Sequence, residues 1–418
     1  MNLNKKITEI IKMLSTNYNK NLLNLQDVLI KKIDKDENTF KIHIEMPVKE
    51  QICPHCKNKT NYIHGYRKQT VKDIEGYGHK TLLIYNKRRY RCKKCGKCFS
   101  EKNTFLPKYH RMTSRLIATI INKLSSEVSF THVAGEVNLS VSTVIRIYDK
   151  INYPKANTLP EVLAIDEFKG NTGGEKYNCI LTDPKSGVVL DILESRKKHI
   201  LTDYFKSANR QNTKYFVSDM WEPYRDISTV FFMNAIQIVD KYHYVRQIMW
   251  ALEDTRKKVQ KQFCKSHRIY FKRSKSLLTK RYDKLTDEQK TQVKIMLDVS
   301  ADLSTAYFMK EDFLNILNIK DIEKQKKELN NWILWTRDCP IERFKQCSET
   351  ITNWYSGISN SFSTPYTNGF TEGCNNKIKV LKRLAYGYTN FRRFRNRILH
   401  IFSNKTAKKI NNINEATA

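Results

Sequence analysis

Two Cys-x-x-Cys pairs constrain the N-terminal part of this chain more than any other feature of its sequence. They read Cys53-Pro-His-Cys56 and Cys92-Lys-Lys-Cys95, and residues 57–91 separate them. Four cysteine thiolates are the ligand set of a closed, tetrahedral zinc site. Because the segment is small and basic and has little apolar core, a bound metal would supply much of its folding free energy. The spacing therefore predicts a module that one structural Zn²⁺ holds together.

The number and position of the cysteines favour a metal over disulfides. The chain has 10 cysteines in 418 residues, and five of them lie within residues 53–98. That is too sparse for a disulfide scaffold, and the first residues lack the apolar core of a secretion signal. Four unconnected thiols or a redox pair are the alternative. Cys98 and His55 are spare ligands, so the exact ligand set stays open at this point.

The charge of the chain predicts a polyanionic partner. Lys plus Arg number 75 against 42 Asp plus Glu, a formal net charge of +33, and 40% of the residues are hydrophobic. Such an excess repels itself in a compact fold, whereas binding to nucleic acid releases counterions from the phosphates. A basic protein without such a partner, or one that binds anionic membranes, is the alternative. No run approaches the ~18 uncharged apolar residues of a membrane span, so we expect no membrane association and a cytoplasmic location.

Residues 129–148 predict a helix-turn-helix. Ser129–Val137 can form one helix, Asn138–Ser140 a turn and Val141–Tyr148 a second helix. In this motif the second helix enters the major groove of DNA. An ordinary helical hairpin is the alternative. The residues that we expect to contact DNA, in this helix and in the basic segment between the cysteine pairs, are Ser140, Ser142, Thr143, Arg146, Arg88 and Arg89.

Residues 160–243 have the pattern of an α/β sheet. The apolar run Val162–Asp166 comes first. Tyr177–Asp183 and Val188–Leu193 follow, and they flank turn residues as the two strands of a hairpin do. Helical and strand-like stretches then alternate as far as Asp240. We expect a ribonuclease-H-like catalytic domain.

Two acidic residues end strands of this predicted sheet. Asp166 ends the first strand, and Asp219 ends the strand after the first helix. In a ribonuclease-H-like arrangement these strands are neighbours, so the two carboxylates converge and need a divalent cation such as Mg²⁺ or Mn²⁺. Two such ions about 3.5–4 Å apart can activate a water or a 3′-hydroxyl at a phosphodiester. Glu372 is the best candidate for a third carboxylate, and Glu167 and Asp191 are nearby alternatives.

The remaining polar residues allow a structural interpretation as well as a functional one. Most strand-end acids cap or solvate loops, so each carboxylate alone could be structural. Asp240 and His243 bracket a strand end, where they either orient the site or make a packing hydrogen bond. The end of the chain from residue 375 carries 11 Lys and Arg against one acid. The residues there that we expect to grip the phosphate backbone are Lys377, Lys379, Lys382 and Arg383.

Taken in order, these motifs resemble those of a known family, the bacterial insertion-sequence transposases of the IS-L-three (ISL3) type, which have an Asp-Asp-Glu (DDE) centre. The resemblance runs roughly from residue 50 to residue 400. The extra Cys98 is a departure from it. The matching motifs are Cys53-Pro-His-Cys56, Arg88-Arg-Tyr-Arg-Cys92, Ala164-Ile-Asp-Glu-Phe168, Ser218-Asp-Met-Trp-Glu-Pro-Tyr224, Asp240-Lys-Tyr-His243 and Gly369-Phe-Thr-Glu-Gly-Cys-Asn-Asn-Lys-Ile-Lys379.

The resemblance implies an enzyme that moves its own insertion sequence. It implies Asp166, Asp219 and Glu372 as catalytic acids that hold two Mg²⁺ (or Mn²⁺) ions, and the four cysteines as ligands of zinc. Double-stranded DNA is then the partner, with the terminal inverted repeats as substrate and at least a dimer at the paired ends, in the bacterial nucleoid. A catalytically inactive DNA-binding regulator and a nuclease that cuts without joining are the alternatives.

We therefore expect a multidomain α+β protein. A zinc-ribbon-like module and a helix-turn-helix precede a ribonuclease-H-like domain, which a helical insertion interrupts and a basic helical C-terminus follows. The expected boundaries are 1–48 for an N-terminal segment, 49–105 for the zinc module, 106–153 for the helix-turn-helix, 160–243 and 356–418 for the catalytic core with its basic tail, and 244–355 for the insertion.

Overall fold

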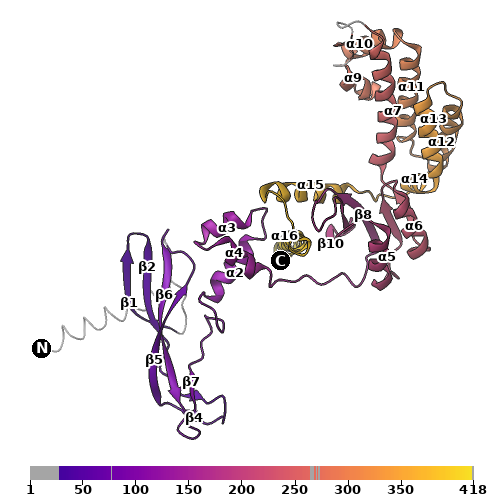
Figure 1. Cartoon of the computed structure of the whole chain (residues 1–418). Coiled ribbons are helices and arrows are strands. Elements are labelled where there is room, and N and C mark those ends of the chain that lie inside the picture. The colour runs from indigo at the N-terminus through magenta and orange to yellow at the C-terminus, as the bar shows by residue number, and fades with distance from the viewer. Residues whose placement is uncertain (1–27, 77, 264–267, 270, 272–273, 417–418) are drawn as a thin grey trace. The chain divides into compact units, whose positions relative to one another are not determined.

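The structure is a computed structural model that describes residues 28–416, except 77, 264–267, 270 and 272–273, with side chains described as far as Ser403. The amphipathic start of the sequence lies outside the described residues. The chain divides into two compact units, Met1–Asn152 and Tyr153–Ala418 (Figure 1). None of the helices in the described ranges is both long and apolar enough to cross a membrane.

The first unit contains a five-stranded sheet and a small hairpin. The order in the sheet is β1-β2-β6-β5, and β7 pairs with β6. Alternate apolar side chains of the paired strands, among them Ile42, Val71 and Leu83, form its core. The strands are β1 (Leu29–Asp36), β2 (Thr39–Glu45), β5 (Ile63–Lys72), β6 (Lys80–Arg91), β7 (Cys98–Ser100) and, in the hairpin, β3 (Gln51–Ile52) and β4 (Lys59–Thr60).

This sheet differs from the expected division of the N-terminal part. The sequence pattern separates 1–48 from 49–105, whereas β2 pairs in parallel with β6 over Thr39–Ile44. The first two strands are therefore part of the sheet that carries the cysteine segment. The pattern could not show this, because strand pairing across a long connection leaves no local signal.

Three helices follow the sheet in the described part of the first unit. They are α2 (Ser114–Lys123), α3 (Phe130–Glu136) and α4 (Val141–Tyr148). The side chains of Thr113, Ser129 and Ser140 each accept a backbone N–H at the start of one helix, which is why the helices begin there. Between α3 and α4, Asn138 takes a positive φ of 53°. The predicted helix, turn and second helix are present at the predicted residues.

The second unit is built on a mixed five-stranded sheet of order β10-β9-β8-β11-β12. Neighbours are antiparallel from β10 through β9 to β8 and parallel from β8 through β11 to β12. The helices α5 and α6 cover one face. The elements are β8 (Val162–Phe168), β9 (Asn178–Asp183), β10 (Val188–Leu193), α5 (Lys198–Ser207), β11 (Tyr215–Ser218), α6 (Glu222–Phe231) and β12 (Ile236–Val239).

Successive side chains of β8 point to opposite faces of the sheet, and different helices cover the two faces. Leu163 and Ile165 pack with residues of α5 and α6. Val162 and Ala164 point to the other face. That face carries α15 (Gly369–Leu384) and α16 (Phe391–Ala416), which lie against β8 and β10 respectively, whereas α14 (Tyr355–Phe362) lies against the edge strand β12. Asp166 belongs to this second face, and β8 continues past it to Phe168 instead of ending at the carboxylate as predicted.

In chain order, a helical bundle follows β12 and precedes the last two helices. Its core includes Ile248, Phe313, Trp332 and Phe344, and α7 runs from the edge of the sheet into it (Figure 1). The helices are α7 (Lys241–Lys261), α9 (Lys275–Thr279), the 3₁₀ turn η1 (Tyr282–Lys284), α10 (Asp287–Asp298), α11 (Ala301–Ile316), α12 (Ile322–Arg337), α13 (Glu342–Asn353) and α14 (Tyr355–Phe362).

Two helices close the second unit, α15 (Gly369–Leu384) and α16 (Phe391–Ala416). The sequence pattern places a loop over 361–375 with Glu372 ahead of the basic helix. In the structure α15 begins six residues earlier than 375, and Glu372 lies in its first turn. The glycine and asparagine residues that read as a loop are thus part of a helix that packs on β8.

Candidate active site and metal centre

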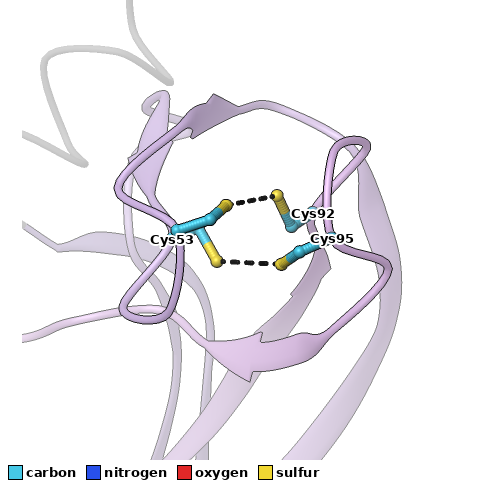
Figure 2. Close-up of side chains that lie close together, drawn as sticks. Cys53, Cys92 and Cys95 are labelled. Atoms are coloured by element: carbon cyan, nitrogen blue, oxygen red, sulfur yellow. Dashed lines mark hydrogen bonds between the residues drawn. The ribbon is translucent and has the colours of Figure 1, made fainter.

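The four cysteines of the first unit converge. Sγ of Cys53 lies 3.6 Å from Sγ of Cys95, and Sγ of Cys56 lies 3.4 Å from Sγ of Cys92 (Figure 2). All four sulfur atoms lie within 4.8 Å of one another. A tetrahedral zinc ion with Zn–S bonds of about 2.3 Å would hold its sulfur ligands about 3.8 Å apart. The cluster therefore fits a structural Zn²⁺.

The local backbone explains why each pair forms a ligand turn. Lys57 and Gly96, each directly after the second cysteine of its pair, have positive φ values of 60° and 70°. These turns aim backbone N–H groups at the first cysteine, which lowers the pKa of Cys53 and lowers the pKa of Cys92 to about 6. The thiolate form that binds metal is thus favoured by the turn itself. Cys98 and His55, the spare ligands, lie outside this group of four.

The expected DNA contacts in the first unit separate into exposed and buried side chains. Arg89, Ser142 and Arg146 are exposed. Arg88 is buried at 3% exposure, pairs with Glu45 and Glu101, and donates to a backbone carbonyl. The expectation that Arg88 contacts DNA is therefore wrong, because its guanidinium is already used to hold strands together. Sequence cannot distinguish adjacent arginines that point to opposite faces of one strand.

The second unit brings two of the predicted acids together. In the parallel pairing of β8 and β11, Val217 lies opposite Ala164. Two residues beyond this pair in each strand direction, Asp219, which directly follows β11, lies level with Asp166 of β8. Ligand atoms of Asp166, Asp219 and His243 all lie within 4.8 Å of one another. The convergence expected from the strand order is present.

Burial sets the electrostatics of this group. Desolvation, reinforced by neighbouring acids, raises the pKa of Asp166 to about 7 and that of Asp219 to about 8. Within the described chain, Oδ1 of Asp219 is buried without a hydrogen-bond partner. Two close carboxylates with an unpartnered oxygen are a donor set that suits a hard divalent cation.

Glu372, the third predicted acid, lies outside that group. Its side chain is exposed in the first turn of α15, yet its charge is one of the smaller causes that raise the pKa of Asp166. One turn further along the same helix, Asn375 donates from Nδ2 to Oδ2 of Asp166 over 2.9 Å. The first turns of α15 therefore face the carboxylate group, with Asn375 in contact and Glu372 nearby.

Asp240 and His243 have different surroundings. Asp240 is buried and accepts the backbone N–H groups of Tyr242 and Asn368, so it caps α7 and ties the start of α15 to it. Nδ1 of His243 lies 3.2 Å from a guanidinium nitrogen of Arg246. Because arginine only donates, Nδ1 accepts and Nε2 carries the proton. Burial and Arg246 also lower the pKa of His243, so we assign it as a neutral donor.

The two alternative acids are engaged elsewhere. Glu167 pairs with Arg196 over 2.8 Å on the opposite face of β8 from Asp166. Asp191 is buried, pairs with Arg395 over 2.7 Å and accepts from the hydroxyl of Tyr204. Each has cationic or hydroxyl partners that fix it in the fold.

Comparison with known families identifies the family of the chain. The sequence model for the DDE domain of ISL3 elements, described as a transposase, matches residues 163–398, more than half of the chain. The chain belongs to the ISL3 family of transposases. A zinc finger of the transposases of IS204, IS1001, IS1096 and IS1165 matches residues 49–95, and the helix-turn-helix domain of transposase family ISL3 matches residues 101–152.

Two individual relatives are transposases. The chain is 24% identical to the transposase of insertion sequence element IS1001 of Bordetella parapertussis, over 84% of this chain and 88% of the relative. It is 23% identical to the transposase of IS1557 of Mycobacterium tuberculosis over 51% of this chain and 54% of the relative. It also matches a Lactococcus lactis ATP-dependent protease at 33% identity, but over only 25% of this chain and 32% of that protein.

Sequence reasoning missed three residues beside the carboxylates of this transposase. Asn375 lies within the quoted glutamate motif, but an asparagine gives no charge signal. Arg196 and Arg246 both lower the pKa of Asp219 through their charge. Arginines are so frequent in this chain that only the fold, which brings these two near Asp219, distinguishes them from the rest.

Proposed function

We propose that this transposase binds the terminal inverted repeats of its insertion sequence and cleaves and joins DNA strands at the centre formed by Asp166 and Asp219. The observation that carries the proposal is the close approach of the half-buried carboxylate of Asp166 and the buried one of Asp219. One oxygen of Asp219 has no hydrogen-bond partner among the residues that the structure describes. Such a cluster is costly to keep in a fold without a cation to neutralise it.

The donor set fits Mg²⁺ or Mn²⁺. Asp166 and Asp219 would hold the metal, and Glu372, near them on the first turn of α15, is our candidate for the third carboxylate of a two-ion site. When bound, these ions supply Lewis acidity at a phosphodiester and lower the pKa of an attacking water or 3′-hydroxyl. Residues that hold the acids in place are therefore part of the machinery.

Several side chains position this centre. Asn375 and the backbone N–H of Glu167 each donate to Asp166, which fixes the orientation of that carboxylate. His243, protonated on Nε2 only, can donate to a phosphate oxygen without adding a charge. Asp240 joins α7 to the start of α15, so the helices that carry His243 and Glu372 are positioned together.

The proposal includes the fold of the catalytic core and the boundaries of the domains. The strand order β10-β9-β8-β11-β12, with its hairpin followed by parallel strands, supports a ribonuclease-H-like catalytic core. We propose 160–243 and 356–418 as that core with its tail and 244–355 as the insertion. The exposed face of α4, with Ser142 and Arg146, would read the ends, and pairing of two ends implies at least a dimer.

The test is cleavage and joining of DNA that carries the inverted repeats flanking this gene. Asp166→Asn, Asp219→Asn and Glu372→Gln are compared with wild type in Mg²⁺, with Glu222→Gln as a matched control, since Glu222 is 80% exposed at the start of α6. We expect the three variants to bind the ends but neither cut nor join them. Equal binding without cutting by every protein, wild type included, would support an inactive regulator. Cutting without joining would support a nuclease.

A further inference from the structure

Three side chains form a stacked ladder on the exposed face of α7. The guanidinium carbon of Arg246 lies 5.3 Å from the ring centre of Tyr242 on one side and 4.7 Å from that of Trp250 on the other. These residues are four apart, so they follow one face of the helix. The opposite face of α7, with Tyr244, Ile248 and Leu252, is buried in the bundle.

The ladder begins at the carboxylate group. His243, Arg246 and Trp250 are spaced three and four apart, so the helix face that presents His243 to Asp166 and Asp219 continues into the ladder. Arg246 also contacts the ring of His243 directly. Asp240 caps this helix and fixes where the face begins. The ladder is therefore a continuation of the site.

The side chains of the ladder are exposed in a way that packing does not explain. Tyr242 is 55% exposed and Trp250 is 45% exposed. Nε of Arg246 is buried without a hydrogen-bond partner in the described part of the chain. Exposed aromatic rings interleaved with a cation are the features that proteins use to bind unpaired bases, because every base has a π face and the backbone beside it is anionic.

We propose that Tyr242, Arg246 and Trp250 are a stacking platform for one unpaired base of the DNA strand whose phosphodiester is cut. The inference rests on the proposed function, since it takes Asp166 and Asp219 to be the place of cutting. Trp250 lies seven positions after His243 in α7, a rise of about 10 Å along the helix. At about 3.4 Å per nucleotide the base lies within roughly three nucleotides of the cut.

The experiment measures cleavage by the full chain on duplex element ends in which each of the three nucleotides on either side of the cut is made abasic in turn. Wild type is compared with Trp250→Ala and Trp250→Phe. Trp335→Ala is the matched control, because Trp335 is 52% exposed on α12. On unmodified ends we expect Trp250→Ala to cut about tenfold more slowly, Trp250→Phe to recover most of the rate, and Trp335→Ala to match wild type.

The abasic substrates decide what the platform binds. If Trp250 stacks on one base, the ratio of wild-type to Trp250→Ala rates falls to about one when that base is missing and stays near ten at the other positions. A ratio that persists at all six positions, or that accompanies a change in oligomeric state, overturns the proposal in favour of a protein interface. An unchanged rate for Trp250→Ala on every substrate overturns it as well.

Failure of the proposed function has a different signature. In that case wild type cuts none of the substrates in Mg²⁺. Stacking of a base on the platform is then tested with element ends that carry 2-aminopurine at the same positions and are bound to the protein. A fluorescence change in wild type that is absent in Trp250→Ala supports it, and equal signals from the two proteins contradict it.

Discussion

The cysteine cluster of the first unit and the carboxylate group of the second are both metal-type donor sets, but they are assembled in opposite ways. Each cysteine pair is a local turn whose backbone N–H groups already favour thiolate. The carboxylates come from separate strands, and the fold raises their pKa values. The first set is closed with four soft ligands, whereas the second has an oxygen without a hydrogen-bond partner in the described part of the chain. A closed set suits a structural ion and an open one suits chemistry on a bound substrate.

The largest effect that follows from this contrast is on folding of the first unit. Cys92→Ser removes one of four zinc ligands, and structural zinc supplies binding free energy on the order of 10 kcal/mol to small modules. We expect loss of zinc by elemental analysis, loss of β structure by circular dichroism and loss of binding to element ends. Cys98→Ser is the matched control and leaves all three unchanged. Equal zinc content in both variants would show that the ligand set is wrong.

The corresponding substitution in the second unit should affect activity and not folding. Asp219→Asn should lower strand cleavage on the order of 10⁴-fold, as loss of a catalytic carboxylate does in other enzymes. It should also leave the metal-free fold intact or more stable, because it removes a buried carboxylate whose Oδ1 has no hydrogen-bond partner among the described residues. Thermal unfolding without divalent metal measures the second part. A large loss of metal-free stability would make Asp219 a structural residue.

Substitutions of Arg88 and Arg89, which are neighbours in β6, should have separate effects on stability and on DNA binding. Arg88→Ala leaves the carboxylate of Glu101 buried without its cationic partner, so we expect a loss of about 3–5 kcal/mol in the free energy of unfolding. Arg89→Ala should leave stability unchanged and reduce the salt dependence of DNA binding by about one phosphate contact. Denaturant unfolding and binding at several salt concentrations check both. Equal effects of the two substitutions on stability would contradict the burial seen here.

The last expected effect is a pH dependence of stability that comes from the carboxylate group. The folded-state pKa values of Asp166 and Asp219, about 7 and about 8, lie above the unfolded values. Their contribution to metal-free stability is thus complete below about pH 4 and is lost as pH rises through 7 and 8. Mg²⁺ should offset the loss at the alkaline end. Thermal unfolding across this range should show the slope in wild type and a smaller slope in Asp219→Asn.

The difference between the two donor sets also explains which features of the fold and the site the sequence alone predicts. The zinc ligands, α3, α4 and the hairpin of β9 and β10 depend on local spacing, turn residues and caps, and the sequence pattern predicts them. The convergence of Asp166 and Asp219 required an assumed strand order. The pairing of β2 with β6, the burial of Arg88 and the contact of Asn375 with Asp166 depend on residues far apart in the chain, so no local pattern reports them.

We propose that Asp166 and Asp219 hold the catalytic metal directly, and a change of metal tests this ligation. In Asp219→Cys a softer thiolate replaces the carboxylate, and thiolates accept Mn²⁺ more readily than Mg²⁺. We expect cleavage of element ends by this variant to be lost in Mg²⁺ and partly restored in Mn²⁺, while wild type works in both. Equal activity of the variant in the two metals, or none in either alongside normal DNA binding and a native fold, would contradict direct ligation by Asp219.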